Sequence, residues 1–169
     1  MTRKTTPYAR KRAAGHGLRP RDGITTSRTY TTRLKPGEVA TILEPCHRAL
    51  QALSTVSATH HQWVVLCTAG HVAEAIEDGR IIRGQREIID AANAALAAIG
   101  ERCGLTATQW HPGPCHNPEI TALADLVAAY SRQVRELTYA EYNAAVDRAV
   151  ARVASVGGQV FRMGEETTT

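Results

Sequence analysis

The sequence has few aromatic residues and no long apolar run. One Phe, two Trp and five Tyr make up 5% of its 169 residues, although apolar residues reach 43%. Alanine supplies much of this apolar content, and an alanine-rich, aromatic-poor composition favours close-packed helices over sheets. No run long enough to cross a bilayer occurs, so we expect no membrane contact. The composition predicts an all-α domain of ordinary size.

Motifs for metal, redox or phosphate chemistry are also scarce. The four cysteines, Cys46, Cys67, Cys103 and Cys115, are widely spaced and include no Cys-x-x-Cys pair. The N-terminus has no apolar stretch typical of a signal peptide, so reduced thiols in a cytoplasm are expected. No glycine-rich loop stands between a strand and a helix. We therefore expect a non-enzymatic protein without a cofactor.

Positive charge is concentrated at the N-terminus. Residues 1–35 hold ten Lys or Arg and one acid, a net charge of +9, whereas residues 36–169 hold ten Arg and fifteen acids, a net charge of −5. Large apolar residues are rare in the first segment, which predicts a disordered basic arm. Such an arm can bind nucleic acid through its phosphates. The residues expected to do so are Arg3, Lys4, Arg10, Lys11, Arg12, Arg19 and Arg21.

Apolar residues spaced three and four apart predict about five helices after the arm. The expected ranges are 45–56, 59–78, 83–102, 117–137 and 138–157. Residues 39–43 are expected to form an extended lead-in or one helical turn. We expect one helical domain over 36–157, preceded by the arm at 1–35 and followed by a loose tail at 158–169.

Several helix starts carry recognisable capping residues. Thr59 with Gln62, and Thr138 with Glu141, match the capping-box pattern. Pro45 suits the first position of a helix, where its missing N–H costs nothing. Asn117 is expected to cap the fourth helix.

The stretch "WHPGPCHNPE", residues 110–119, concentrates histidine, cysteine and proline. Its prolines and glycine predict a stiff turn between two helices. Trp110 is the residue expected to seat this turn on the core.

A zinc site is the alternative interpretation of the same residue types. Cys67 and His71 are four residues apart on one predicted helix face, and Cys115 with His116 or His111 would complete a tetrahedron. A small zinc-binding protein or enzyme would use Cys67, His71, Cys115 and His116. Against this, the spacing is not that of compact zinc modules. Cys115 and His116 are also a weak nucleophile–base pair, because adjacent side chains rarely point at each other.

Three segments resemble a known family in content and order. They are "SATHHQWVVLCTAGHVAEAIEDG", "EIIDAANAALAAIGER" and "NPEITALADLVAAYSRQVRELTYAEYNAA". Together they resemble an uncharacterised family of small helical proteins encoded by bacteriophages and prophages of Gram-negative bacteria, over about residues 33–150. The resemblance implies a phage or mobile-element accessory protein in the host cytoplasm, and it carries over no functional residues.

An unidentified host or phage protein is the expected partner beside nucleic acid. The small residues of "AANAALAA" permit close helix–helix approach, either within one chain or in a homodimer. The sequence therefore predicts a partner-binding protein whose arm adds electrostatic affinity for nucleic acid.

Overall fold

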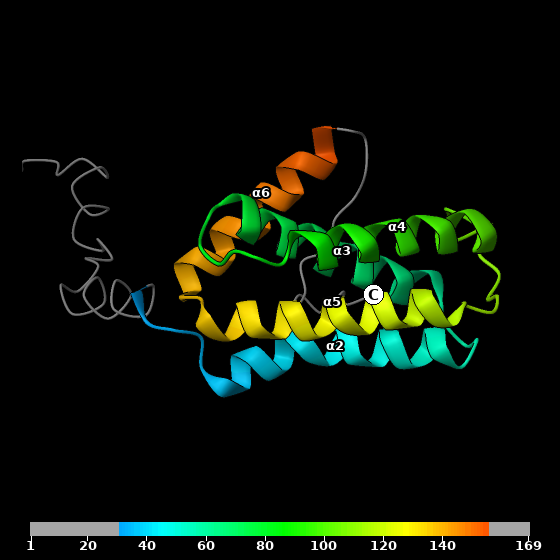
Figure 1. Ribbon diagram of the computed structural model, residues 1–169, viewed down its shortest axis with the longest axis horizontal. Helices are drawn as coiled ribbons and strands as arrows, with labels where there is room; N and C mark the ends of the chain where they lie inside the picture. Colours follow the sequence, from blue (N-terminus) through cyan, green and yellow to red (C-terminus); the bar gives the residue numbers. More distant parts are fainter. Residues whose placement is uncertain (1–30, 156–169) are drawn as a thin grey trace, which may run out of the picture.

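The computed structural model describes residues 31–155, which form five α-helices (Figure 1). The helices are α2 (Pro36–Ser54), α3 (His60–Asp78), α4 (Arg86–Cys103), α5 (Asn117–Glu136) and α6 (Tyr139–Ser155). Within this range the only β-type pairing is an isolated bridge between Arg33 and Thr138. The predicted all-α fold of about five helices is confirmed. The expected tail at 158–169 and nearly all of the expected arm lie outside the described residues.

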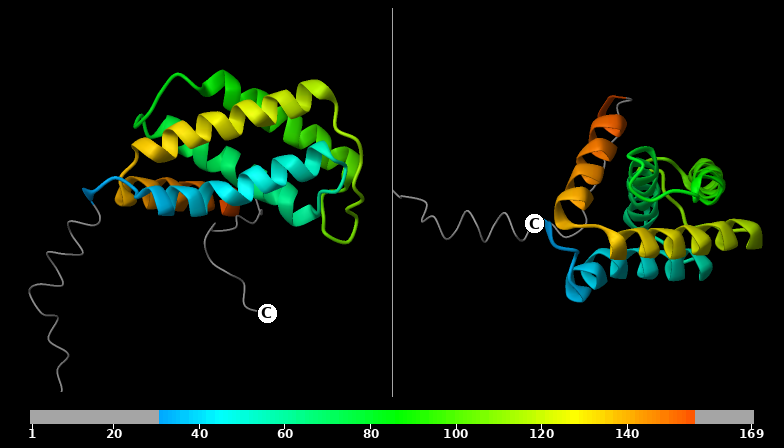
Figure 2. Two further views of the ribbon diagram at one scale, coloured as in Figure 1. Left: turned by 90° about the horizontal axis from the view of Figure 1, so that it is seen from below. Right: turned by 60° about the vertical axis from the view of Figure 1, so that its left-hand side comes forward.

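The first four helices form a ring. α2 packs on α3, α3 on α4, α4 on α5, and α5 returns to α2. α6 packs chiefly on α3 and leans away from the bundle axis, as the right-hand view of Figure 2 shows. α3 thus packs on all four other helices, and every residue of its Val64–Leu66 turn is buried.

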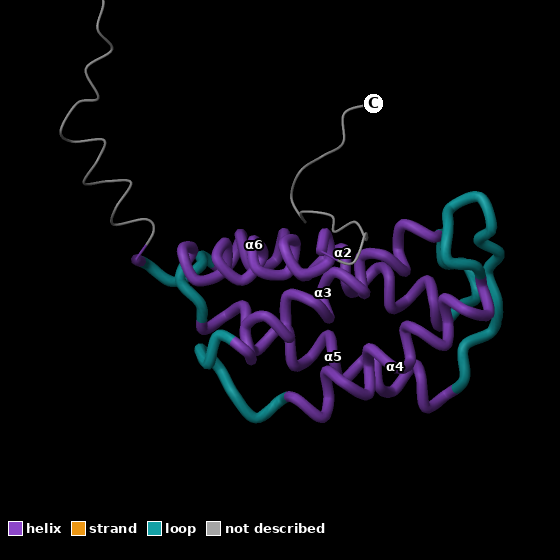
Figure 3. Tube along the Cα trace, turned by 90° about the horizontal axis from the view of Figure 1, so that it is seen from above, coloured by secondary structure: helices purple, strands orange, loops and turns teal. Residues whose placement is uncertain are grey.

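Loops join the helices at two opposite ends of the bundle (Figure 3). We call the end with the 55–59 and 104–116 loops the loop end. We call the opposite end, where the chain enters at residue 31 and the 79–85 loop joins α3 to α4, the arm end. There the backbone N–H of Tyr139 donates to the Thr32 carbonyl at 3.2 Å, and Leu34 N–H donates to Leu137 O at 3.0 Å. The entering segment is thereby tied to the α5–α6 corner.

The expected start of the first helix at Pro45 is wrong. α2 begins nine residues earlier with Pro36 at its first position, and Pro45 lies inside it. The apolar stripe explains the difference, because Val39, Ile42 and Leu43 are buried at helical spacing. Burying such a side chain contributes about 1.5–3 kcal/mol. Three together outweigh the roughly 3 kcal/mol that a proline costs within a helix.

Two other helix starts differ from expectation by a few residues. α4 begins at Arg86 and not near Arg83, because Glu77 holds the preceding loop. Its carboxylate accepts the Gly84 N–H at 2.8 Å. α5 is capped by His116, and the expected cap Asn117 is its first residue.

Both predicted capping boxes are present. The Thr59 hydroxyl accepts the Gln62 N–H at 3.3 Å, and the Gln62 side chain accepts the Thr59 N–H at 2.9 Å. The Glu141 carboxylate accepts the Thr138 N–H at 2.8 Å, while the Thr138 hydroxyl accepts the Glu141 N–H at 3.2 Å. These starts were predictable because the residues that satisfy the first free N–H groups are local in sequence.

Candidate interaction surfaces

The residues of the zinc alternative are spread over two elements. Cys67 and His71 lie on α3, whereas Cys115 and His116 lie in the loop before α5. Burial raises the pKa of the Cys67 thiol to about 12, so this thiol remains protonated near neutral pH. Among residues 31–155, no three His, Cys, Asp or Glu side chains are grouped so as to hold a metal ion. The described residues therefore offer the zinc alternative no assembled site.

An aromatic cluster occupies the loop end. The ring centroids of Trp63 and Trp110 are 5.7 Å apart, and His60 lies 5.4 Å from Trp63 and 5.7 Å from Trp110. The indole N–H of Trp110 donates to the Ala58 carbonyl at 2.7 Å, and that of Trp63 donates to the Leu96 carbonyl at 3.0 Å. Trp110 is partly buried against the core. The prediction that Trp110 seats the 110–119 stretch is confirmed.

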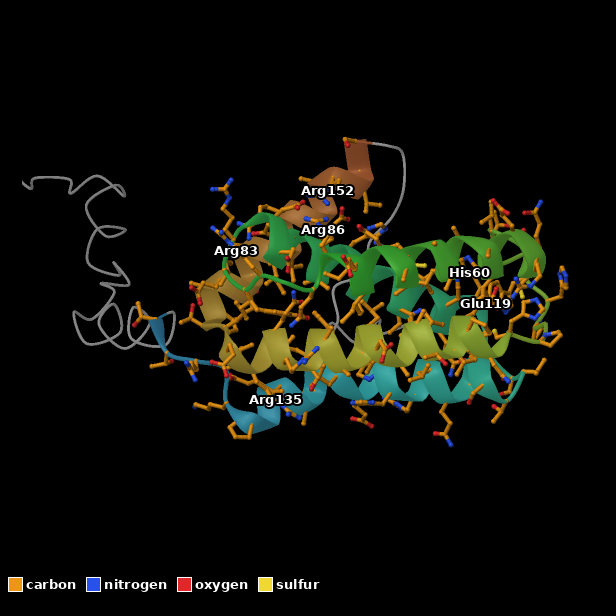
Figure 4. The ribbon with its side chains drawn as sticks, viewed as in Figure 1. His60, Arg83, Arg86, Glu119, Arg135 and Arg152 are labelled. Carbon is orange, nitrogen blue, oxygen red and sulfur yellow. The ribbon has the colours of Figure 1, made fainter. Side chains whose placement is uncertain are left out.

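An ion pair fastens the end of this stretch to α4. The Glu119 carboxylate receives both terminal nitrogens of Arg102, at 2.8 and 2.7 Å, and also the His116 backbone N–H at 2.8 Å. The hydrogen bond from Arg102 is the main reason that the pKa of Glu119 is lowered. This carboxylate therefore caps α5 and also joins it to α4. Figure 4 labels Glu119 at the loop end.

A recess opens beside the aromatic cluster. Its volume is about 540 Å³, and it is lined by Ser57, Ala58, Thr59, His60, His61, Ala107, Trp110 and Pro112. Two large apolar side chains of the adjoining loops are exposed, Val56 at 45% and Leu105 at 58%. Val56 also has a φ of 56°, in the left-handed region that β-branched residues avoid. The loop end thus presents apolar surface on a constrained backbone.

A second, apolar groove runs along α2 next to the point where the chain enters. It has a volume of about 650 Å³, with Leu34, Val39 and Leu43 among its lining residues. Arg48 and Arg135 supply positive charge at its edge, and Arg48 lies 3.5 Å from Glu44. The groove is therefore apolar inside and partly cationic around it.

Charged side chains join three helices at the arm end. Arg86, at the start of α4, pairs with Glu74 and Asp78 of α3, and Arg152 of α6 pairs with the same two carboxylates at 2.9 and 2.6 Å. Hydrogen bonding from Arg152 is the main cause of the lowered pKa of Asp78. Burial is the main cause of the lowered pKa of His71, one turn before Glu74. These four ions fix α6 and the start of α4 on α3.

The residues predicted to contact nucleic acid, Arg3 to Arg21, lie outside the described residues. Two groupings within the described residues escaped the sequence analysis. His60 packs on Trp63 of its own helix and on Trp110 of a distant loop, and no spacing within one helix indicates the second contact. The four-ion group at the arm end joins residues up to 78 positions apart, for which no local spacing gives a signal.

No family model, curated protein or solved structure matches this chain. The resemblance to small phage-encoded helical proteins therefore remains an expectation. No helix among residues 31–155 is long and apolar enough to cross a membrane.

Proposed function

We propose that this protein is a non-enzymatic accessory protein of a phage or mobile element that binds partners in the host cytoplasm. Its basic arm contacts nucleic acid without sequence preference, and its helical domain binds a host or phage protein. The observation that carries the proposal is the charge division, with +9 in residues 1–35 and −5 in residues 36–169. Lys and Arg neutralise phosphates without needing a fixed fold, because affinity follows from the release of counterions.

The loop end supports the part of the proposal that concerns a protein partner. Val56 and Leu105 are exposed beside the recess at Trp110. A Trp beside a pocket, with apolar residues around it, is typical of the centre of a protein interface, where aromatic residues are enriched. The described chain begins at residue 31, at the end of the bundle opposite to His60 and its recess (Figures 1 and 4), so a partner of the arm and a partner of this surface need not compete for the same site.

The test is duplex binding measured by fluorescence anisotropy with the full chain and with a chain lacking residues 1–30. This deletion keeps Thr32, whose carbonyl accepts the Tyr139 N–H. If about five cations of the arm contact phosphates, affinity should fall roughly 500-fold between about 50 and 200 mM salt. The shortened chain should bind far more weakly while its helical circular dichroism is retained.

A full-length variant separates loss of charge from loss of chain. Replacing Arg10, Lys11 and Arg12 by Gln removes three charges, so the log–log salt slope should become shallower by about 2.7. Equal duplex binding by all three proteins would contradict the role of the arm. Absence of binding by the full chain at about 50 mM salt would reject the nucleic-acid function, since non-specific binding is strongest at low salt.

A further inference from the structure

Five arginines gather at one corner of the arm end. Arg80 and Arg83 belong to the loop between α3 and α4, and Arg86 begins α4. Arg148 and Arg152 project from the last turns of α6. Figure 4 shows Arg83, Arg86 and Arg152 in this corner, away from His60 and Glu119 at the loop end. We call these five residues the arginine cluster.

The cluster is held in place by its own ion pairs. Arg86 and Arg152 share the carboxylates of Glu74 and Asp78, and this sharing links α3, α4 and α6. Arg148 lies over the end of α3, with its guanidinium 3.5 Å from the Ala75 carbonyl. The corner is therefore built by three helices and does not depend on one flexible side chain.

The acids of this corner are already engaged inside the domain. Glu74 and Asp78 are shared by Arg86 and Arg152, and the Glu77 carboxylate accepts backbone N–H groups of Gly84 and Gln85, at 2.8 and 3.4 Å. Glu77 thus occupies the position where an external anion would meet the start of α4. Any external anion at this corner must be bound by side chains.

Arg80 and Arg83 are the side chains left for that role. Both are exposed, and neither forms an ion pair within residues 31–155. Glu74, Glu77 and Asp78 face the five arginines, and Asp90, one turn after Arg86 on α4, also acts on its charge, so the guanidinium groups outnumber these four acids by one. The overall charge of the domain is negative, so the arginine cluster is a local positive patch on it.

The cluster lies on the end of the bundle from which the arm departs. The described chain starts at residue 31 beside the α5–α6 corner, and the loop carrying Arg83 lies at this same end in Figures 1, 3 and 4. Arg135, at the last turn of α5, is labelled at this end as well. A polyanion held by the arm would therefore pass close to these guanidinium groups.

We propose that the arginine cluster is a second contact for the phosphate backbone of nucleic acid, with Arg80 and Arg83 binding phosphates that neighbour those held by the arm. The inference rests on the proposed nucleic-acid function of the arm. The fixed planar fork of arginine matches phosphate oxygens, and the ion pairs of Arg86 and Arg152 hold the surface rigid beneath it. The arm supplies reach, and the cluster fixes the direction in which the strand crosses the domain.

Nucleic acid fits this corner better than an acidic protein does. Specific protein interfaces need an apolar centre as well as charge. Two of the three exposed large apolar residues within 31–155, Val56 and Leu105, lie at the opposite end. Ile81 and Ile82, between the two exposed arginines, are instead packed partly against the core.

The test compares two full-length double variants of equal charge. Arg80→Gln with Arg83→Gln removes the exposed cluster residues, and Arg48→Gln with Arg132→Gln removes two exposed arginines from α2 and α5. Binding of a labelled DNA duplex is measured by anisotropy across several salt concentrations. Loss of two phosphate contacts should lower the salt slope by about 1.8 and weaken binding by roughly 10-fold or more at about 100 mM salt. The control should change affinity less than two-fold.

The outcomes distinguish failure of the arginine-cluster inference from failure of the proposed arm function. If the unaltered chain binds duplex but both variants bind alike, the cluster is not a contact and the arm function stands. If the unaltered chain does not bind, both the arm function and the cluster inference are rejected. If the cluster variant loses binding to poly-glutamate but not to duplex, the corner recognises acidic protein, which overturns the inference. Unchanged thermal unfolding of both variants confirms that the comparison concerns binding and not folding.

Discussion

At the loop end two indole rings and an imidazole lie 5.4–5.7 Å apart, whereas at the arm end two arginines and two carboxylates join three helices. The loop end is fastened by packing, by indole N–H groups that donate to carbonyls, and by one ion pair, Arg102–Glu119, whose carboxylate is largely covered. The arm end is fastened by ion pairs whose side chains are 24–40% exposed. Water and salt weaken exposed ion pairs much more than they weaken apolar contacts.

Because the two ends are held together differently, we expect their surfaces to bind different kinds of partner. Packing gives the loop end a fixed apolar shape, which suits recognition of a protein. Ion pairs leave the corner of the arm end formed by α3, α4 and α6 charged and hydrated, which suits a polyanion whose binding depends on salt. Substitutions at the two ends should therefore change stability in different ways.

The largest effect is expected for Trp110→Ala. This substitution removes the ring that packs on His60 and Trp63 and leaves the Ala58 carbonyl without its indole donor. Losing a buried Trp costs about 3–5 kcal/mol. Because Trp110 is only partly buried, we expect about 3 kcal/mol from urea unfolding.

His111→Ala is the matched control for this substitution. His111 is exposed, and its Nδ1 lies 3.1 Å from the carbonyl of Gln109, two residues away. Substitutions of this kind usually change stability by less than about 0.5 kcal/mol. Equal losses for the two variants would show that the whole loop, and not the ring of Trp110, carries the stability of this end.

Two glycine substitutions, one at each end, should have smaller effects on stability. A Cβ at Gly100 would lie 2.7 Å from Trp63 Cζ2 and 3.0 Å from Leu105 Cδ2, so Gly100→Ala must displace the Trp63 ring. Overpacking of this kind costs about 1–3 kcal/mol. At the arm end, a Cβ at Gly37 meets nothing within 4 Å.

Gly37→Ala should therefore stabilise the first turn of α2 by about 0.5 kcal/mol, because alanine loses less backbone entropy than glycine on folding. Thermal unfolding of both variants checks the pair. Opposite shifts in melting temperature are expected. A stabilising Gly100→Ala would mean that the ring of Trp63 has room to move and that the loop end is not tightly packed.

Much of the fold could be predicted from the sequence because its signals are local. Apolar residues at helical spacing predict the helix at 83–102, and Ile89, Ala92 and Leu96 are buried on α4 at that spacing. The Thr59–Gln62 and Thr138–Glu141 pairs predict two helix starts. The missed start of α2 shows where local reasoning fails. Pro45 is favourable at a first helical position, but its place inside the helix is decided by burial of Val39 and Ile42, which depends on helices that come later in the chain.

The candidate surfaces were less accessible to prediction. Trp110 was expected to seat its loop, since a large apolar residue in a polar turn has few other places to go. Its partners His60 and Trp63 are about fifty residues away, and no spacing rule joins them. The shared use of Glu74 by Arg86 and Arg152 depends on how α6 leans on α3, which the sequence pattern does not specify.

The smallest single effect, that of Asp78→Asn, belongs to a pair of substitutions that change the response to acid. Glu119 at the loop end and Asp78 at the arm end both have a pKa below the usual range, mainly because of Arg102 and Arg152 respectively. A carboxylate with a lowered folded-state pKa contributes stability that is present above its unfolded pKa, about 4, and is lost as pH falls through the folded-state pKa. Both groups therefore stabilise the protein at neutral pH and cease to do so in acid.

Glu119→Gln and Asp78→Asn should each reduce the difference in unfolding free energy between neutral pH and about pH 2. The side chain of Glu119 is only 13% exposed, whereas that of Asp78 is 38% exposed. The first substitution should cost about 1 kcal/mol at neutral pH, and the second only a few tenths after screening by solvent.

Urea unfolding at both pH values, repeated in about 0.5 M salt, separates the two ends. The salt should remove most of the Asp78 effect and leave much of the Glu119 effect, because a covered ion pair is screened less than an exposed one. An equal response to salt would show that the two ends do not differ in how their charges are protected.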